Sequence, residues 1–347
     1  MRGGRQRATL RRALMVAVVL VLAGAIGAAP AAAKPTLIRA FGKLGTGAGR
    51  FHDPIGIAVG SGGHLYVADA MNNRVEEFTS GGVFVRTWGF GVQNGSAAFQ
   101  ICTSSCRKGI LGAGNGQFDF PWGIAVNRAG HVFVTDSSNN RVEEFTAGGA
   151  FVEAFGTFGS GAGQFFNPLG ITFAPDGDLS IVDNGNQRID KFTPQRAFIR
   201  AWGWGVADGG HRLETCTATC QTGLTGKGNG EFDGPDSIVT NSAGRVFVTD
   251  NGNNRVEKFG GAGAFIARWG SRLLSNPFGI IVDTDGRIEV ADTDHDRIAQ
   301  FTAAGAFVTR WGAAALSLPS GLAALPDDRL VVTDDGHNQV VKYAQTG

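Results

Sequence analysis

One cassette recurs six times along the chain and strongly limits what the chain can fold into. Each copy has an apolar residue three positions before a proline, an apolar segment, a second segment ending in aspartate, and an Asn/Arg turn. The six anchors are Phe51-x-x-Pro54, Phe118-x-x-Pro121, Phe165-x-x-Pro168, Phe232-x-x-Pro235, Leu274-x-x-Pro277 and Leu316-x-x-Pro319. A repeat of this size is typical of a solenoid or a propeller.

Each copy carries four β-strand signals. In the first copy they cover residues 55–59, 64–68, 74–78 and 83–88, separated by turn residues. Helical repeats are excluded because no segment keeps a helical period, and glycine interrupts the chain about every 8 to 12 residues. The pattern therefore predicts an all-β, six-bladed β-propeller of four-stranded blades.

The two ends of the repeat region indicate how the ring closes. The sixth copy supplies only three strands, the last at residues 339–343, whereas residues 36–42 resemble the fourth strand of the other copies. We expect this N-terminal strand to complete the last blade, which removes an open sheet edge.

The first 33 residues differ from the rest. Five arginines precede an apolar run over residues 13–26, and an alanine-rich segment before Lys34 offers an A-x-A cleavage site. Residues 1–33 are predicted to be a secretory signal peptide, with an uncleaved anchor as the alternative. Arg11-Arg12 leaves both general secretion and twin-arginine export open.

Residues 34–347 are predicted to form one exported, monomeric domain. This region has 26 basic and 30 acidic residues, a net charge of −4. That balance argues against a nucleic-acid partner, whose phosphates require a basic surface. No second apolar run reaches the roughly 18 residues of a membrane span, so none is expected in the mature chain.

The cassette closely resembles the NHL repeat. The first copy reads Pro54-Ile55-Gly56-Ile57-Ala58, then Asp69, then Asn72-Asn73-Arg74-Val75, and the resemblance covers residues 36–347. Two copies depart from the pattern: Gln339 replaces the arginine in the last, and Ser237 replaces a glycine in the fourth. The resemblance implies a fold more than a function, because the family includes protein-binding platforms, RNA-binding propellers, sensor heads and, rarely, lyases.

Aspartate and arginine recur as pairs five residues apart. They could form a ring of charges around a channel mouth. We favour a structural role, in which each aspartate accepts backbone N–H bonds at its turn and each arginine packs between blades, because repeated positions chiefly serve repeat stacking. The pairs are Asp69/Arg74, Asp136/Arg141, Asp183/Arg188, Asp250/Arg255 and Asp292/Arg297.

Two long connections break the sixfold pattern. The inserts at residues 90–112 and 204–224 are related copies at an offset of 114 residues, and they hold all four cysteines. In an exported chain the first choice is two disulfides, Cys102–Cys106 and Cys216–Cys220, and the alternative is one zinc site of four cysteines.

Long loops on a rigid scaffold often carry binding sites. We expect the inserts to rise beside the Asp/Asn/Arg turns and to wall one mouth of the channel, where they would bind a protein, peptide or surface glycan. The candidate binding residues are Phe99, Ile101, Arg107, Lys108, His211, Arg212, Leu213 and Glu214.

No catalytic residues, metal ligands or cofactor are predicted. The six histidines are scattered without ligand spacing, and no phosphate loop or nucleophile elbow occurs. A non-catalytic binding or scaffold module is therefore the favoured function. The alternatives are a metal-dependent propeller enzyme, of lyase or lactonase type, and an extracellular sensor head.

Overall fold

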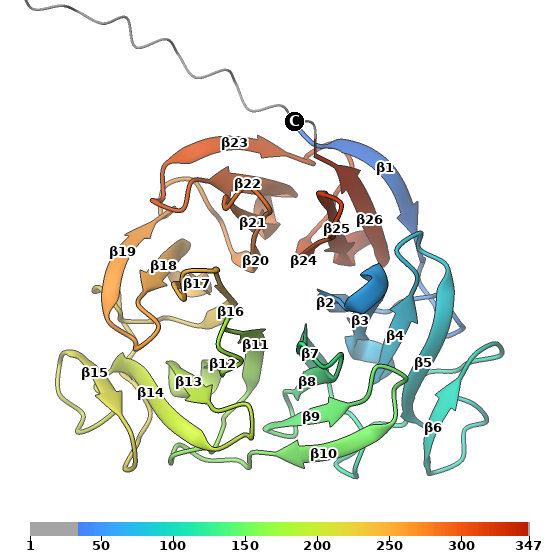
Figure 1. Cartoon of the computed structure of the whole chain (residues 1–347), viewed down its shortest axis with the longest axis horizontal. Coiled ribbons are helices and arrows are strands. Elements are labelled where there is room, and N and C mark those ends of the chain that lie inside the picture. The colour runs from blue at the N-terminus through green and yellow to red at the C-terminus, as the bar shows by residue number, and fades with distance from the viewer. Residues whose placement is uncertain (1–33, 346–347) are drawn as a thin grey trace, which may run out of the picture. The chain divides into compact units, whose positions relative to one another are not determined.

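The computed structural model describes residues 34–345, which form six antiparallel sheets around a central axis (Figure 1). Each sheet is one blade, with its first strand nearest the axis. This confirms the all-β, six-bladed propeller. The predicted signal peptide, residues 1–33, lies outside the described residues. Within the described residues, the only helices are single 3₁₀ turns, and none is long and apolar enough to span a membrane.

In the first three blades the strands follow chain order from the inner to the outer edge. Blade 1 consists of β2 (Pro54–Val59), β3 (Leu65–Asp69), β4 (Arg74–Phe78), β5 (Phe84–Phe90) and β6 (Phe99–Cys102). Blade 2 consists of β7 (Pro121–Val126), β8 (Val132–Asp136), β9 (Arg141–Phe145) and β10 (Phe151–Phe155). Blade 3 consists of β11 (Pro168–Phe173), β12 (Leu179–Asp183), β13 (Arg188–Phe192), β14 (Phe198–Trp204) and β15 (Leu213–Cys216).

The other three blades have four strands each. Blade 4 consists of β16 (Pro235–Thr240), β17 (Val246–Asp250), β18 (Arg255–Phe259) and β19 (Phe265–Trp269). Blade 5 consists of β20 (Pro277–Val282), β21 (Ile288–Asp292), β22 (Arg297–Phe301) and β23 (Phe307–Trp311). Blade 6 consists of β24 (Pro319–Ala324), β25 (Arg329–Asp334), β26 (Gln339–Ala344) and β1 (Thr36–Phe41).

The six 3₁₀ turns are single turns of three residues. One, η1 (Ser61–Gly63), joins the first two strands of blade 1. The others follow the second strands of blades 1, 3, 4, 5 and 6, and are η2 (Ala70–Asn72), η3 (Asn184–Asn186), η4 (Asn251–Asn253), η5 (Thr293–His295) and η6 (Asp335–His337).

Ring closure follows the prediction from the sequence. Strand β1 pairs antiparallel with β26, and Phe41 lies opposite Val340 in the register. Phe41 also contacts Phe78 of blade 1, with ring centroids 5.1 Å apart. The N-terminal strand therefore completes blade 6 and packs against blade 1.

The hydrophobic core lies between neighbouring blades. Strands such as β3 are buried along their whole length. The anchor Phe51 is fully buried in a cluster that joins Val67 of blade 1 to Val331 and Val340 of blade 6. Burying one such phenylalanine contributes about 1.5–3 kcal/mol, so the repeated anchors supply much of the blade-to-blade cohesion.

The inner strands approach one another so closely that they need glycine. A Cβ on Gly56 would lie 2.2 Å from the carbonyl oxygen of Trp122 in the next blade. The glycine that follows Pro-x in five of the six copies is thus a packing requirement of the ring.

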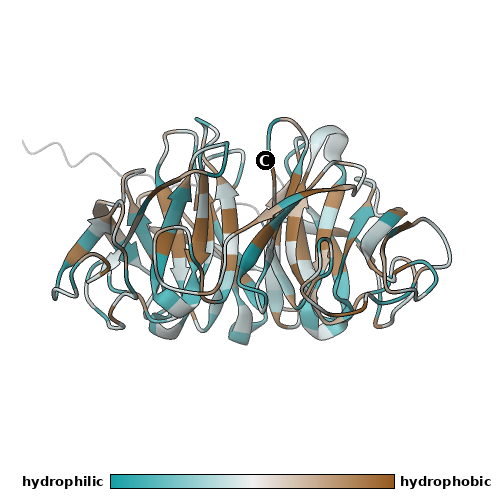
Figure 2. Cartoon of the chain, turned by 90° about the horizontal axis from the view of Figure 1, so that it is seen from below, coloured by the Kyte–Doolittle hydropathy of each residue, from teal (hydrophilic) through white to brown (hydrophobic). Residues whose placement is uncertain are grey.

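One face of the ring carries both the turns between second and third strands and the connections from blade to blade; we call it the turn face. In the side view of Figure 2 the strands run between two loop-bearing faces, and hydrophobic residues concentrate in the strands. Each second-to-third-strand turn ends in a left-handed residue: Asn73, Asn140, Gln187, Asn254, Asp296 and Asn338.

Candidate functional site

The repeated Asp/Arg pairs are buried structural elements. All five aspartates of the pairs are fully buried, so none is available as a charge at a channel mouth. Asp69 accepts a hydrogen bond from the backbone N–H of His52, two residues before the cassette proline, at 2.7 Å, and ion-pairs with Arg74. From the sequence we expected each aspartate to accept hydrogen bonds from its own turn. In the structure the N–H group belongs instead to the connection that precedes the first strand of the blade.

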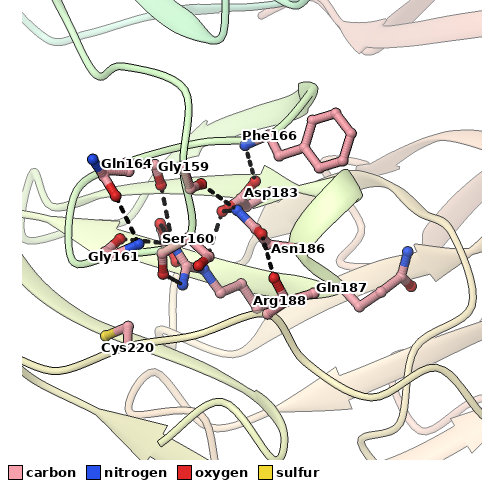
Figure 3. A network of polar contacts seen from close by, with 12 residues as sticks. Gly159, Ser160, Gly161, Gln164, Phe166, Asp183, Asn186, Gln187, Arg188 and Cys220 are labelled. Carbon is pink, nitrogen blue, oxygen red and sulfur yellow. Dashed lines mark hydrogen bonds and ion pairs between the residues drawn. The ribbon is translucent and has the colours of Figure 1, made fainter.

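The arginine clamps a glycine-rich loop, as blade 3 shows (Figure 3). Arg188 pairs with Asp183 at 3.0 Å and donates to the carbonyl oxygens of Gly161 and Gln164, both at 3.0 Å. Asn186 adds a bond to the same carboxylate at 2.7 Å. Burial outweighs these favourable contacts and raises the pKa of Asp183 to about 6.

The two inserts each add a fifth strand to a blade, where the sequence predicted loops. Strand β6 pairs with β5 at the outer edge of blade 1, and β15 pairs with β14 at the outer edge of blade 3. Figure 1 shows both strands at the outer rim of the ring. The expectation that the inserts wall the channel mouth is therefore wrong.

The structure divides the predicted binding residues into two groups. Phe99, Ile101 and Leu213 are half-buried and pack against the hydrophobic cluster between their own blade and the next. Glu214 is buried and accepts a hydrogen bond from the backbone N–H of Ala207 at 2.8 Å. The exposed members are Arg107, Lys108, His211 and Arg212.

The four cysteines form the two disulfides that were the first choice from the sequence. Cys102 joins Cys106 with Cα atoms 5.6 Å apart, and Cys216 joins Cys220 at 5.5 Å. The zinc alternative is wrong because all four cysteines are consumed in two separate disulfides. Among residues 34–345, no group of three or more His, Cys, Asp or Glu side chains is placed to hold a metal ion.

After its disulfide, each insert returns to the turn face and contacts an Asp/Asn/Arg turn. This part of the prediction, that the inserts lie beside these turns, agrees with the structure. In the first insert the N–H of Gly109 donates to the carbonyl of Asn72 at 2.7 Å, and Arg74 donates to the carbonyl of Arg107 at 2.9 Å. In the second, Gly223 donates to Asn186 at 2.8 Å.

Large apolar side chains are exposed on the turn face of blades 1–3. Leu44, Leu111 and Phe158 occupy the same repeat position, seven residues before an anchor phenylalanine, and are 59%, 61% and 67% exposed. Met71 and Phe166 are also exposed, and the rings of Phe158 and Phe166 lie 5.4 Å apart. We call Leu44, Met71, Leu111, Phe158 and Phe166 the apolar arc.

The axis of the ring contains a cavity of about 350 Å³ lined by the inner strands of all six blades. Asp236 faces this cavity and is 6% exposed. Burial raises its pKa to about 7, although a hydrogen bond with the side chain of Trp122 acts in the opposite direction. The rings of Trp122 and Phe278, both cavity-lining, stack with centroids 5.9 Å apart.

Comparison with known protein families identifies the repeat. The model of the NHL repeat matches residues 51–78, 118–145, 232–259 and 316–343, which cover the first three strands of blades 1, 2, 4 and 6. The structure shows that blades 3 and 5 have the same strand order and a left-handed residue at the same turn position, Gln187 and Asp296. The chain is an NHL-type β-propeller.

Solved structures with similar folds have varied roles. Virginiamycin B lyase from Staphylococcus aureus, solved with quinupristin, is 17% identical, with a TM-score of 0.53 over 90% of this chain and 89% of that one. A chain of the nidogen/laminin complex is 15% identical, with a TM-score of 0.53 over 78% and 84%. Regucalcin from Agrobacterium tumefaciens, a calcium-binding protein, is 11% identical, with a TM-score of 0.54 over 88% and 96%. These similarities show the fold alone.

Two features of this NHL-type propeller were not anticipated from its sequence. The apolar arc could have been found from the shared position of Leu44, Leu111 and Phe158 once the copies were aligned. Asp236 had a weaker signal: it adjoins Ser237, which departs from the repeat pattern.

Proposed function

We propose that this NHL-type propeller is an exported, monomeric and non-catalytic binding module that holds a protein or peptide partner on the turn face of blades 1–3. The apolar arc is the observation that carries this proposal. Large apolar side chains that stay exposed on one face of a protein favour an interaction surface.

The loops that present the arc are firmly held. The loop ahead of blade 1 is fixed by Arg74, which donates to the carbonyls of Thr46 and Gly47 at 2.8 and 2.9 Å. A surface that is ordered before binding loses little conformational entropy when a partner docks. The exposed Arg107 and Lys108 of the first insert add positive charge near Leu111 and favour an acidic rim on the partner.

Two further observations support export and protein binding. Disulfides persist mainly in oxidising compartments, so the two cysteine pairs agree with the predicted signal peptide. A propeller of similar fold is seen in the nidogen/laminin complex, so this scaffold is compatible with a protein partner. A surface glycan is the alternative ligand, and crosslinking from the arc distinguishes the two.

A photo-crosslinking side chain placed at Leu111, in cells that make the protein, tests the proposal. We expect it to capture a discrete protein, whereas the same group at Val83, 59% exposed at the turn on the opposite face, should not. With the captured partner purified, L111S combined with F158S should weaken binding at least about tenfold. V83S is the matched control and should bind normally.

Three outcomes would contradict the proposal. One is crosslinking at Val83 but not at Leu111, and another is unchanged affinity in the double variant. The third is saturable binding to a purified surface glycan with no protein captured, which would replace the protein partner by a glycan. Thermal unfolding of each variant checks that the serine substitutions leave the propeller intact.

A further inference from the structure

Blade 4 breaks the symmetry of the ring at the axis. Its inner strand begins Pro235-Asp236-Ser237, whereas the residue after the proline is uncharged in the other blades. Among the residues that line the axial cavity, Asp236 is the only one with an acidic or basic side chain. The residues at the same position are Ile55, Trp122, Leu169, Phe278 and Ser320.

The surroundings of Asp236 form a built pocket. Trp122 and Phe278 come from blades 2 and 5, and their stacked rings line the same cavity as the carboxyl group. A third ring, that of Phe120, has its centroid 5.6 Å from that of Trp122. The cavity volume of about 350 Å³ falls within the range of small-molecule sites.

A cation would stabilise the carboxylate of Asp236 in the axial cavity. Burying a carboxylate without a charged partner is costly, and no cationic side chain lines the cavity. Calcium and magnesium require about six or more oxygen ligands, whereas the side chains that line the cavity offer one carboxylate and the hydroxyl groups of Thr172, Ser237 and Ser320. An organic ammonium is suited to these walls because its charge can pair with the carboxylate and lie against an aromatic face.

We propose that the axial channel binds a small primary ammonium compound on a slender apolar chain, with Asp236 as the counter-ion and with Trp122 and Phe278 covering the apolar part. This site is separate from the macromolecule-binding role, because the apolar arc contributes nothing to it. The two proposals can therefore fail independently.

The binding should depend on pH. No other side chain that lines the cavity is acidic or basic, and the side chain of Trp122, which hydrogen-bonds with Asp236, does not titrate near neutrality. The pKa of Asp236 is raised to about 7. Because the ammonium needs the ionised carboxylate, affinity should be highest above pH 7 and fall about tenfold per pH unit below it.

Isothermal titration of the purified chain with pentylammonium chloride at pH 8 tests this proposal. We expect saturable binding of one ligand per chain, weakened at least about tenfold in D236N and equally weak for the neutral 1-pentanol. D285N, which removes an exposed carboxylate beside Arg287, is the matched control and should bind normally. Because Trp122 touches the ligand, W122F should remove the change in tryptophan fluorescence that accompanies binding.

Several results would overturn the proposal. Equal affinity for 1-pentanol would make the channel a purely apolar site, and unchanged binding in D236N would remove Asp236 from it. Saturable binding of calcium chloride with no response to pentylammonium would make it a metal site. If D236N fails to fold, the pH series on the unaltered chain decides, since a flat profile between pH 5 and 8 contradicts a carboxylate counter-ion.

Discussion

At the scale of single residues, the left-handed residue of each turn serves two purposes. Asparagine tolerates a positive φ better than most residues, which explains its preference at this position. Its side-chain oxygen also accepts a backbone hydrogen bond from the next blade: Asn73 from Phe120 at 3.1 Å, and Asn338 from Asp53 at 3.0 Å. Turn geometry and blade cohesion thus depend on the same side chain.

The arginine clamp can be tested by comparing two blades. Arg188 is fully buried between Asp183 and Asp190, whereas Arg297 is partly exposed, pairs with Asp292 and has Ala299 in place of the second carboxylate. We expect R188M to lower the free energy of unfolding by about 3–5 kcal/mol, because it leaves two buried carboxyl groups without a cation. R297M should cost about 1–2 kcal/mol.

Urea unfolding monitored by tryptophan fluorescence measures both variants. Equal losses would show that neither the second carboxylate nor the contacts to the glycine-rich loop add to the ion pair. Arg297 donates to only one loop carbonyl, that of Leu273 at 2.9 Å, so the difference between the two blades measures these two contributions together.

The structural role of the repeated aspartates and arginines could be predicted from recurrence alone, but the importance of Asp236 could not. In a regular strand, alternation shows which side chains share a face. The pairing of β16 with β17 shifts register between Pro235 and Ile238, and the first strands of the other blades shift in the same way. This irregularity falls at Asp236, so only the three-dimensional structure shows that it faces the axis.

At the scale of elements, the inserts are the main difference between expectation and structure. Strands β6 and β15 have only four residues each, so the sequence lacks the alternation that marks a longer strand. Their pairing depends on the open edge of β5 and β14, which local sequence does not reveal. The disulfides were predictable because they join neighbouring cysteines in duplicated segments.

Removing one disulfide tests whether it pins its insert strand. We expect C216S combined with C220S to lower the free energy of unfolding by less than about 3 kcal/mol, because the closed loop is short. The local effect should be larger: Cys216 pairs with Ala201 in the ladder and packs with Val206, so the amides of β15 should exchange with solvent faster.

Hydrogen–deuterium exchange followed by mass spectrometry measures this effect. Peptides covering β12 serve as the internal control, because this strand lies near the centre of the same blade. Unchanged protection of β15 in the double variant would show that ladder pairing alone holds the insert.

At the scale of the whole molecule, the fold was predictable because six copies of one cassette leave few architectures open. Closure was also predictable, since the last copy lacks a strand that the N-terminal segment supplies. The proposed binding face was not predictable, because the apolar arc depends on which loop residues remain exposed once the arginine contacts hold the glycine-rich loops in place. Leu44 and Phe51 form an isolated bridge across one such loop, and no local sequence pattern marks that contact.

Ring closure gives the last prediction. A chain that begins at Phe41 lacks most of β1 and leaves the edge of β26 open, whereas a chain that begins at Lys34 keeps the strand. We expect the shorter chain to unfold about 5–10 °C lower and to aggregate in a concentration-dependent manner, because an unpaired edge can pair with another molecule. Calorimetry and light scattering measure the two effects.

L37S combined with I38S in the longer chain is the control, because both side chains are exposed and the ladder remains. Equal melting of the shorter and longer chains would show that packing between blades 6 and 1 closes the ring without this strand.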